Sequence, residues 1–202
     1  MLNKPSEADL GSEWEPQRRI IEAAQNGDLD ALGSLYDSHI NQVYRYSLAR
    51  LGNVQDAEDV VSEIFYKMLN GLPNYQWRKV PFAAWLMRIA HNEVISFTRR
   101  NGRRANDTEL PDDILDRGHH NDPAESAERQ LALEDLRKAV ELLPEAQREV
   151  IILRFASGLS VADTAKALGK QENNVKVLQH KGMQRLQVLM TPKYPELAQK
   201  QS

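Results

Sequence analysis

The most constraining feature of this sequence is a stretch near its C-terminal end, LSVADTAKALGKQENNVKVLQHKGMQRL, which runs from Leu159 to Leu186. Ser160 and Asp163 stand at its start in the pattern of a capping box, in which the two side chains satisfy free amide groups of the first helical turn. Gly169 follows the apolar positions of this helix, where a left-handed C-terminal cap favours a residue without a Cβ. The stretch therefore predicts a short helix, a tight turn and a second helix.

The second predicted helix begins near Glu172 and separates an apolar stripe from a polar face. Its inward positions recur at helical spacing and are Val175, Leu178, Gly182, Leu186 and Leu189. The opposite face carries Asn174, Lys176, Val177, His180 and Lys181. Two short helices joined by a glycine-containing turn are typical of a helix-turn-helix, whose second helix enters the DNA major groove. A helical hairpin inside a bundle has the same pattern, so the DNA-binding interpretation depends on the polar face, where asparagine can read adenine and lysine can neutralise phosphate.

Composition limits what else the chain can be. Charged residues make up 27% of the 202 residues but the formal net charge is only −3, so any nucleic-acid surface must be a local patch. The chain has no cysteine, which excludes disulfides, thiolate metal sites and thiol redox sensing within it. No apolar run is long enough to span a bilayer, and the polar N-terminus lacks the order of a signal peptide. We therefore expect a cytoplasmic protein with no membrane insertion.

Helical patterns divide the chain into two parts. Residues 1–16 are polar and are predicted to form a flexible leader. Helical periodicity follows over residues 17–104 and returns over residues 129–190. Residues 105–128 are acidic with almost no apolar side chains, which predicts an extended linker, and residues 191–202 are predicted to be a short frayed tail. We therefore predict an all-α protein of two small helical domains.

One helix of the first domain has an acidic outer face. Its apolar residues from Ala57 to Leu69 form an uninterrupted inward stripe. The outer face carries Asp56, Glu58, Asp59 and Glu63. A run of charges on a helix is most often a solvated face, and the residues alone favour that interpretation.

An aromatic and basic loop precedes the next helix. Tyr75 and Trp77 stand beside Arg78 and Lys79, and the helix that follows ends in the basic run RRNGRR. Bases stack on aromatic rings and phosphates are attracted to cations, so this composition suits a single-stranded nucleic acid. The alternative is that the aromatic residues belong to the core, which we expect for those at the start of the helix itself.

No catalytic constellation is present in the sequence. The motifs GxxxxGK[ST], GxSxG and HExxH are absent, and the carboxylates lie on predicted solvated faces or in the linker. His119 and His120 have neither cysteine partners nor the i, i+4 spacing of helical metal ligands, and we expect them to be solvated. We therefore predict that the protein is not an enzyme and uses no metal or cofactor.

Taken together, these motifs resemble a known family. The runs DAEDVVSEIFYKM and FAAWLMRIAHN, an acidic spacer, the run LPEAQREVIILRF and the helix-turn-helix occur in the order found in sigma factors of RNA polymerase. The arrangement is similar to the compact extracytoplasmic-function (ECF) group, which keeps only the second and fourth conserved regions. The resemblance covers about residues 17–189 and implies a promoter-melting bundle, region 2, followed by a helix-turn-helix domain, region 4.

The resemblance also implies roles for individual residues. The acidic helix face would dock on the clamp coiled coil of the polymerase's largest subunit, instead of being merely solvated. The aromatic loop would capture a flipped base of the minus 10 promoter element. One flank of the next helix would contact the same element through Arg88, Asn92, Ser96 and Arg99. The second helix of the helix-turn-helix would read the minus 35 element through its polar face.

The sequence departs from the family pattern at a few positions. Many relatives have Asp where this chain has Ser96, and a Ser-Arg-Leu run where it has Val177-Leu178-Gln179. Gly182 replaces the usual Ala, which lowers helix propensity by roughly 1 kcal/mol. These departures bear on which DNA sequence is read, and we expect the fold to be retained.

The resemblance implies three partners: core RNA polymerase, promoter DNA and an anti-sigma factor that holds the protein inactive. The charge of the acidic linker is expected to mimic nucleic acid in the basic channel of the polymerase. Two alternatives stand beside this interpretation. A one-component helix-turn-helix regulator would bind duplex DNA without needing the acidic face, and a protein-interaction module or anti-sigma antagonist would not contact DNA.

Overall fold

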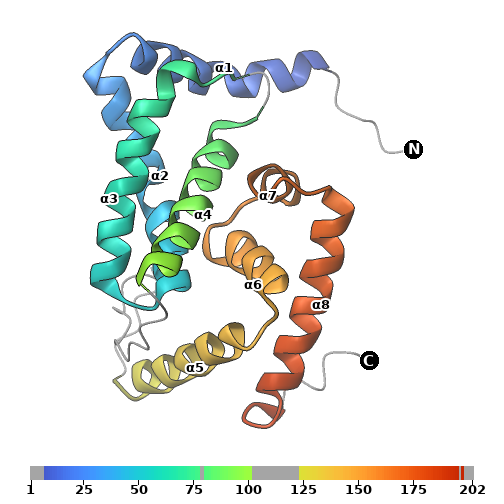
Figure 1. Ribbon diagram of the computed structural model, residues 1–202. Helices are drawn as coiled ribbons and strands as arrows, with labels where there is room; N and C mark the ends of the chain where they lie inside the picture. Colours follow the sequence, from blue (N-terminus) through green and yellow to red (C-terminus); the bar gives the residue numbers. More distant parts are fainter. Residues whose placement is uncertain (1–6, 78–79, 102–122, 196, 198–202) are drawn as a thin grey trace.

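The computed structural model describes residues 7–77, 80–101, 123–195 and 197, and every regular element among them is a helix (Figure 1). The N-terminal half contains α1 Glu7–Gln25, α2 Leu29–Leu51, α3 Val54–Gly71, the short turn η1 Leu72–Asn74 and α4 Phe82–Asn101. The C-terminal half contains α5 Pro123–Glu141, α6 Glu145–Ile151, the π-helical turn η3 Ile152–Ala156, α7 Val161–Leu168 and α8 Glu172–Met190. The prediction of an all-α protein built from two helical parts is confirmed.

Local sequence signals set the ends of several helices. The Ser160 hydroxyl accepts a hydrogen bond from the amide of Asp163 at 3.0 Å, which caps α7 as the capping-box pattern predicts. Gly169 ends the same helix with a φ of 63°, a left-handed conformation that favours glycine. Asn53 caps α3 by accepting from the amide of Asp56 at 2.9 Å. The predicted turn follows Gly169, and the second helix of the predicted helix-turn-helix is α8.

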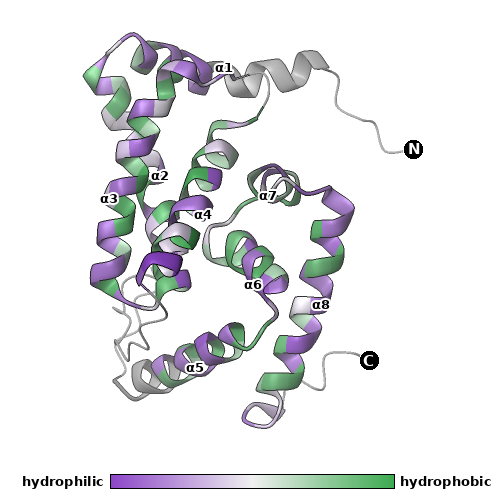
Figure 2. Cartoon of the chain, in the orientation of Figure 1, coloured by the Kyte–Doolittle hydropathy of each residue, from purple (hydrophilic) through white to green (hydrophobic). Residues whose placement is uncertain are grey.

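The core of the N-terminal half lies between α2, α3 and α4, with α1 across one end (Figure 1). Hydrophobic and hydrophilic segments recur along the turns of α3, as expected for an amphipathic helix (Figure 2). Six of its seven predicted inward residues are buried: Ala57, Val60, Val61, Ile64, Phe65 and Met68. The prediction is wrong for Leu69, whose exposed fraction is 46%. Leu69 lies in the last turn of α3, which ends at Gly71.

The C-terminal half packs around a close approach of α8 to α6. A Cβ added to Gly182 would lie 2.9 Å from Cγ1 of Ile151, which is closer than real side chains pack. Gly182 therefore lowers the helix propensity of α8, but it permits a contact that the usual Ala would disturb. Farther along the hairpin, Val150, Ala165 and Val175 form a small buried cluster between α6, α7 and α8.

The two halves pack directly against each other. α7 lies against α4, and η3 lies against α2 (Figure 1). Four buried apolar residues of the C-terminal half belong to the same cluster as the core of the N-terminal half, and they are Ile152, Leu153, Leu159 and Ala167. The molecule is therefore closed, with the helix-turn-helix seated on α4.

The predicted leader and linker are partly helical. α1 begins at Glu7, so residues 7–16 of the predicted leader are helical even though Pro16 lies inside the helix. α5 begins at Pro123, a residue favoured in the first helical position, so the linker prediction over residues 123–128 is wrong. The rest of the linker to residue 122, with His119 and His120, lies outside the described residues.

The beginning of the predicted frayed tail is held in place. The carboxylate of Asp135 in α5 accepts hydrogen bonds from Nζ of Lys193 at 2.5 Å and from the hydroxyl of Tyr194 at 3.1 Å. Gln187 donates to the carbonyl of Leu197 at 2.7 Å. These contacts fold the chain after α8 back onto the helices. Residues 198–202 lie outside the described residues.

Candidate nucleic-acid and protein interfaces

The acidic face of α3 projects into solvent. Glu58, Asp59 and Glu63 are exposed, whereas Asp56 is partly buried in the first turn. Glu63 lies 3.7 Å from Lys67, and both side chains are 46% exposed. Exposed pairs of this kind contribute little to stability, because solvent screens the charges. The three exposed carboxylates are therefore available to a basic partner surface.

The same helix exposes two apolar residues that sequence reasoning missed as surface features. Tyr66 is 62% exposed and Leu69 is 46% exposed. Tyr66 follows Glu63 by three residues, so the two side chains are neighbours on the helix surface. Apolar residues rimmed by charge are typical of protein interfaces. The helical spacing from Glu63 was the signal that would have found Tyr66.

Tyr75 is inside the protein and not on the loop surface. It is 7% exposed, and its hydroxyl donates to the carbonyl of Val80 at 2.7 Å. Its ring centroid lies 5.6 Å from that of Phe82, in an edge-to-face arrangement, and 4.9 Å from that of Trp85. Burial raises the pKa of Tyr75 above its usual range. Tyr75 thus anchors the loop to the core through its ring and its hydroxyl.

Of the other three residues of the predicted aromatic loop, only Trp77 is among the described residues. Trp77 is partly buried and packs against the main apolar cluster. Arg78 and Lys79 lie outside the described residues. Phe82 is fully buried, as expected for the aromatic residues at the start of α4, and Trp85 is partly buried beside it.

The predicted flank of α4 forms a continuous polar stripe. Its members recur at intervals of three or four residues, with Arg88, Asn92 and Arg99 exposed and Ser96 partly exposed. One end of the stripe reaches the C-terminal half, since Nη2 of Arg88 lies 3.5 Å from the position that a Cβ on Gly169 would occupy. The flank therefore begins beside the turn of the helix-turn-helix and runs away from it.

A buried carboxylate supports the basic end of α4. The side chain of Glu93 is 3% exposed and accepts from Nη2 of Arg100 at 2.9 Å. It also pairs with Nζ of Lys67 from α3, and this hydrogen bond raises the pKa of Lys67. Two cations thus compensate one buried negative charge. Glu93 was not singled out in the sequence, because Lys67 is brought to it only by the packing of α3 on α4.

The predicted polar face of α8 is exposed along its whole length. Asn174, Lys176, His180 and Lys181 are exposed, and Val177 is 50% exposed. The two residues after Val177 point inward. Leu178 packs on the small cluster of α6, α7 and α8, and Oε1 of Gln179 accepts from Nε of Arg154 at 2.9 Å.

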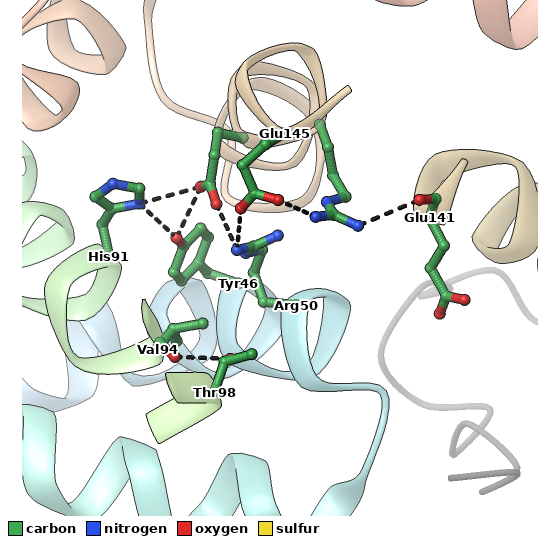
Figure 3. A network of polar contacts seen from close by, with 9 residues as sticks. Tyr46, Arg50, His91, Val94, Thr98, Glu141 and Glu145 are labelled. Carbon is green, nitrogen blue, oxygen red and sulfur yellow. Dashed lines mark hydrogen bonds and ion pairs between the residues drawn. The ribbon is translucent and has the colours of Figure 1, made fainter. Parts of the chain in front are cut away.

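A buried carboxylate of α6 joins the two halves (Figure 3). The side chain of Glu149 is 5% exposed, and one oxygen forms an ion pair with Arg50 of α2 at 2.6 Å. The other oxygen accepts from the hydroxyl of Tyr46 at 3.1 Å and lies 3.1 Å from Nδ1 of His91 in α4. Arg50 also donates to Glu145 at 2.9 Å. We call these five residues the junction network.

In the junction network Glu149 and Arg50 form a charged pair, and the neutral hydroxyl of Tyr46 donates a hydrogen bond to Glu149. Burial, together with the negative charge of Glu149, raises the pKa of Tyr46 well above its usual value. Burial alone would lower the pKa of Arg50, but the negative charges of Glu149 and Glu145 raise it instead. Burial likewise opposes the charged form of Glu145, and Arg50 and Arg148 nevertheless lower its pKa. Sequence reasoning missed this network, because its members come from three distant segments.

A second polar contact crosses the junction. Nε2 of Gln42 in α2 donates to the carbonyl of Ser157 at 2.7 Å, just after η3. Oε1 of Gln42 lies 3.4 Å from Nδ1 of the buried His39, whose ring stands 5.2 Å from that of Phe82. Burial lowers the pKa of His39, against the opposing effect of the Gln42 contact.

Two absences hold for the residues that the structure describes. None of the helices there is both long and apolar enough to span a membrane. No three His, Asp or Glu side chains in that part of the chain gather closely enough to hold a metal ion.

Two family models match this chain. The model of Sigma-70 region 2 matches residues 35–104, and the model of Sigma-70, region 4 matches residues 133–186. Among curated proteins, the chain is 36% identical over 172 residues to the ECF RNA polymerase sigma factor BldN of Streptomyces coelicolor, covering 85% of this chain and 64% of that protein. It is 34% identical over 176 residues to the ECF RNA polymerase sigma factor SigD of Mycobacterium tuberculosis, covering 83% of this chain and 80% of that protein.

Solved structures have the same fold. CnrH in complex with the cytosolic domain of CnrY matches with a TM-score of 0.68 at 24% identity, covering 87% of this chain and 97% of the solved chain. The sigma factor RpoE, in complex with the anti-sigma factor NepR from Bartonella quintana, matches with a TM-score of 0.57 at 26% identity, covering 78% and 97%. The two family models fall on the two halves described above.

Proposed function

This chain belongs to the ECF group of sigma-70 family sigma factors of RNA polymerase, and we propose that its exposed helix faces direct promoter-specific transcription initiation on the core enzyme. One observation carries the assignment of residues. The faces predicted for polymerase and for the minus 35 element are solvent-exposed on opposite halves of the molecule, on α3 and on α8. A factor that bridges polymerase and DNA needs both.

The α3 face is the proposed polymerase-docking surface. Its exposed carboxylates, Glu58, Asp59 and Glu63, supply the negative rim, and the neighbouring Tyr66 supplies apolar area. Asp56 is partly buried at the helix start, so we assign it a smaller direct contribution. Charge complementarity of this kind steers association and selects the partner.

The α4 flank and the loop before it are proposed to bind the melted minus 10 element. Arg88, Asn92, Ser96 and Arg99 line one side of the helix, where cations and amides can meet phosphates and base edges. Because Tyr75 is buried, we assign it to shaping the loop, with stacking on a flipped base left to Trp77 and phosphate contacts to Arg78 and Lys79.

The exposed face of α8 is proposed to read the minus 35 element in the major groove. Its two lysines can neutralise phosphates, and Asn174 can pair with an adenine edge. Reading both promoter elements at once requires the two halves to separate, because the α4 flank begins beside the turn of the helix-turn-helix in the closed molecule. Polymerase would hold the halves apart at the spacing of the two promoter elements.

We also propose an anti-sigma factor as regulator and the cytoplasm as location. The support is the solved complex of the relative RpoE with the anti-sigma factor NepR and the polymerase-bound role of the family. A one-component regulator is not favoured, because the region 2 match over residues 35–104 would have no purpose in it.

The test is promoter-specific initiation in a reconstituted system. The purified chain is added to bacterial core RNA polymerase and a library of genomic fragments, and transcript start sites are mapped by sequencing. We expect starts that share two upstream sequence elements. The variant Asp59→Arg reverses an exposed charge on the docking surface, and Asp37→Arg is its matched control, an exposed acidic residue on the outer side of α2.

The expected outcome is loss of specific transcripts with Asp59→Arg and retention with Asp37→Arg. If both variants transcribe like the unchanged chain, the α3 face is not the docking surface. If the unchanged chain gives no specific starts with any fragment, the proposed use of these faces in initiation is wrong.

A further inference from the structure

Val177 is the one apolar side chain on the exposed face that α8 presents over Asn174 to Lys181. It is 50% exposed and belongs to none of the buried clusters, although valine gains by burial. Its neighbours on this face are Lys176, His180 and Lys181. A half-exposed valine amid polar residues has no packing purpose within the described part of this chain.

The rotation of α8 that exposes Val177 is fixed from behind. Leu178 packs into the cluster formed with Val150 and Ala165, and Gln179 accepts from Nε of Arg154 at 2.9 Å. One turn later, a Cβ on Gly182 would meet Ile151 at 2.9 Å, so α8 cannot roll without a clash or a lost hydrogen bond. Val177 is therefore held outward, whereas Leu178 and Gln179 are partly buried.

The chemistry of the major groove offers a side chain like valine one specific partner. Donors and acceptors line the groove on every base pair, and the C5-methyl group of thymine is its apolar feature. A valine side chain can form no hydrogen bond, so the other base edges offer it only desolvation. Resting on the minus 35 reading proposed above, we infer that Val177 is a specificity residue that contacts a thymine methyl in that element.

The residue one turn earlier agrees with this partner. Asn174 stands at i−3 from Val177 and is exposed on the same side of α8. Asparagine forms a bidentate pair with adenine, and every adenine faces a thymine. The two side chains together select an A·T base pair next to another A·T pair. No arginine, the side chain most often paired with guanine, lies on α8 before Arg185.

The experiment removes only the methyl group. Promoters enriched from a random upstream library by holoenzyme, the full chain with core polymerase, are synthesised with each thymine of the upstream element changed in turn to uracil. Binding of holoenzyme to each labelled duplex is then titrated. We expect one position at which uracil weakens binding by about fourfold, the effect of one buried methyl group.

Two variants assign that loss to the side chain. With Val177→Ala the thymine-to-uracil ratio at the sensitive position is expected to fall toward one, because alanine lacks the two methyl groups with which valine reaches the thymine methyl. Val188→Ala truncates a 72% exposed valine at the far end of the same helix and is expected to leave the ratio unchanged.

Two results would overturn the inference, and they are distinguishable. If Val177→Ala keeps the same ratio as the unchanged chain at every position, Val177 does not read a methyl group, although the minus 35 reading stands. If scrambling the whole upstream element leaves holoenzyme binding unaffected, the reading of DNA by α8 is itself wrong, and the inference falls with it.

Discussion

The interior of the N-terminal half and the junction between the halves are both buried, but they are built from different chemistry. Between α2, α3 and α4 the buried side chains are overwhelmingly apolar, with Phe82 and Leu86 at 0% exposure. At the junction the apolar contacts of η3 and α7 surround a charged centre, in which Glu149 pairs with Arg50.

This difference separates a permanent contact from a reversible one. Apolar surface that leaves a core loses its stabilisation to water, whereas a charged pair regains hydration when its partners separate. The junction network holds the halves in register while they are closed and leaves groups that water can solvate when they open. We therefore expect the N-terminal half to keep its core while the C-terminal half moves.

The largest effect is expected in the apolar interior. Phe82→Ala removes a fully buried ring that contacts Tyr75, Trp85 and His39. Truncations of this kind reduce the free energy of unfolding by roughly 3–5 kcal/mol. Urea denaturation of the full chain measures the loss, and Phe155→Ala, which truncates a 56% exposed ring, is the control. Equal losses for the two variants would remove the contrast between interior and surface.

A somewhat smaller effect, of a different kind, is expected at the junction. Glu149→Gln leaves the buried guanidinium of Arg50 with only the largely exposed Glu145 as a charged partner, which is unfavourable by about 3 kcal/mol where the group cannot escape. Here opening of the halves can hydrate it, so we expect faster amide hydrogen exchange along the facing surfaces of α4 and α7, with α2 to α3 contacts retained.

A second variant keeps that prediction specific. Glu149→Leu combined with Arg50→Met replaces the pair by apolar side chains and is expected to restore the slow exchange, because no buried charge remains. Fast exchange in the double variant would mean that packing at the site, and not the charged pair, keeps the halves together.

A dependence on pH is expected from His39, at the boundary of the two regions. Burial lowers its pKa in the folded protein, so the unfolded chain binds a proton first as the pH falls through about 6.5. The stability that depends on neutral His39 is therefore complete above that pH and is lost below it, by at most about 1.4 kcal/mol per pH unit. Denaturation midpoints between pH 7.5 and 5.5 check this, and His39→Gln should flatten the slope. An unchanged slope would exclude His39 as its source.

The smallest effect is expected at the solvent edge of the junction network. The side chain of Glu145 is 58% exposed, so its contact with Arg50 at 2.9 Å is screened, and Glu145→Gln should weaken closure by less than about 1 kcal/mol. Because the pKa of Glu145 is lowered, this contribution is present near neutral pH and is lost in acid below its usual pKa. Exchange in α4 as large as that of Glu149→Gln would erase the distinction between the centre and the edge.

Local patterns in the sequence predicted what local physics determines. The Ser160 cap and Gly169 depend on residues within one turn, and the amphipathic stripe of α3 depends on helical spacing alone, so each was found before the structure. The exposed face of α8 followed from the same periodicity. Leu69 was misassigned because the stripe has no sharp edge in sequence.

Long-range packing was not predictable from the sequence. Glu149 directly precedes the apolar residues at the end of α6, and nothing near it in sequence indicates Arg50 or Tyr46 as partners. Tyr75 looked like an exposed stacking ring because its loop is polar, and its burial depends on the position of α4. The closed arrangement of the halves also depends on long-range packing, so it could not be predicted from the sequence.

We expect the two halves, which are closed in the free protein, to separate when the protein reads two promoter elements. The chain has no cysteine, so Asn41→Cys on α2 and Val188→Cys on α8, both at exposed positions, accept a donor and an acceptor dye at defined sites. Single-molecule energy transfer then compares the free chain with holoenzyme bound to a promoter. We expect one high-transfer population for the free chain and a low-transfer population in the promoter complex. The same transfer efficiency in both states would contradict this expectation.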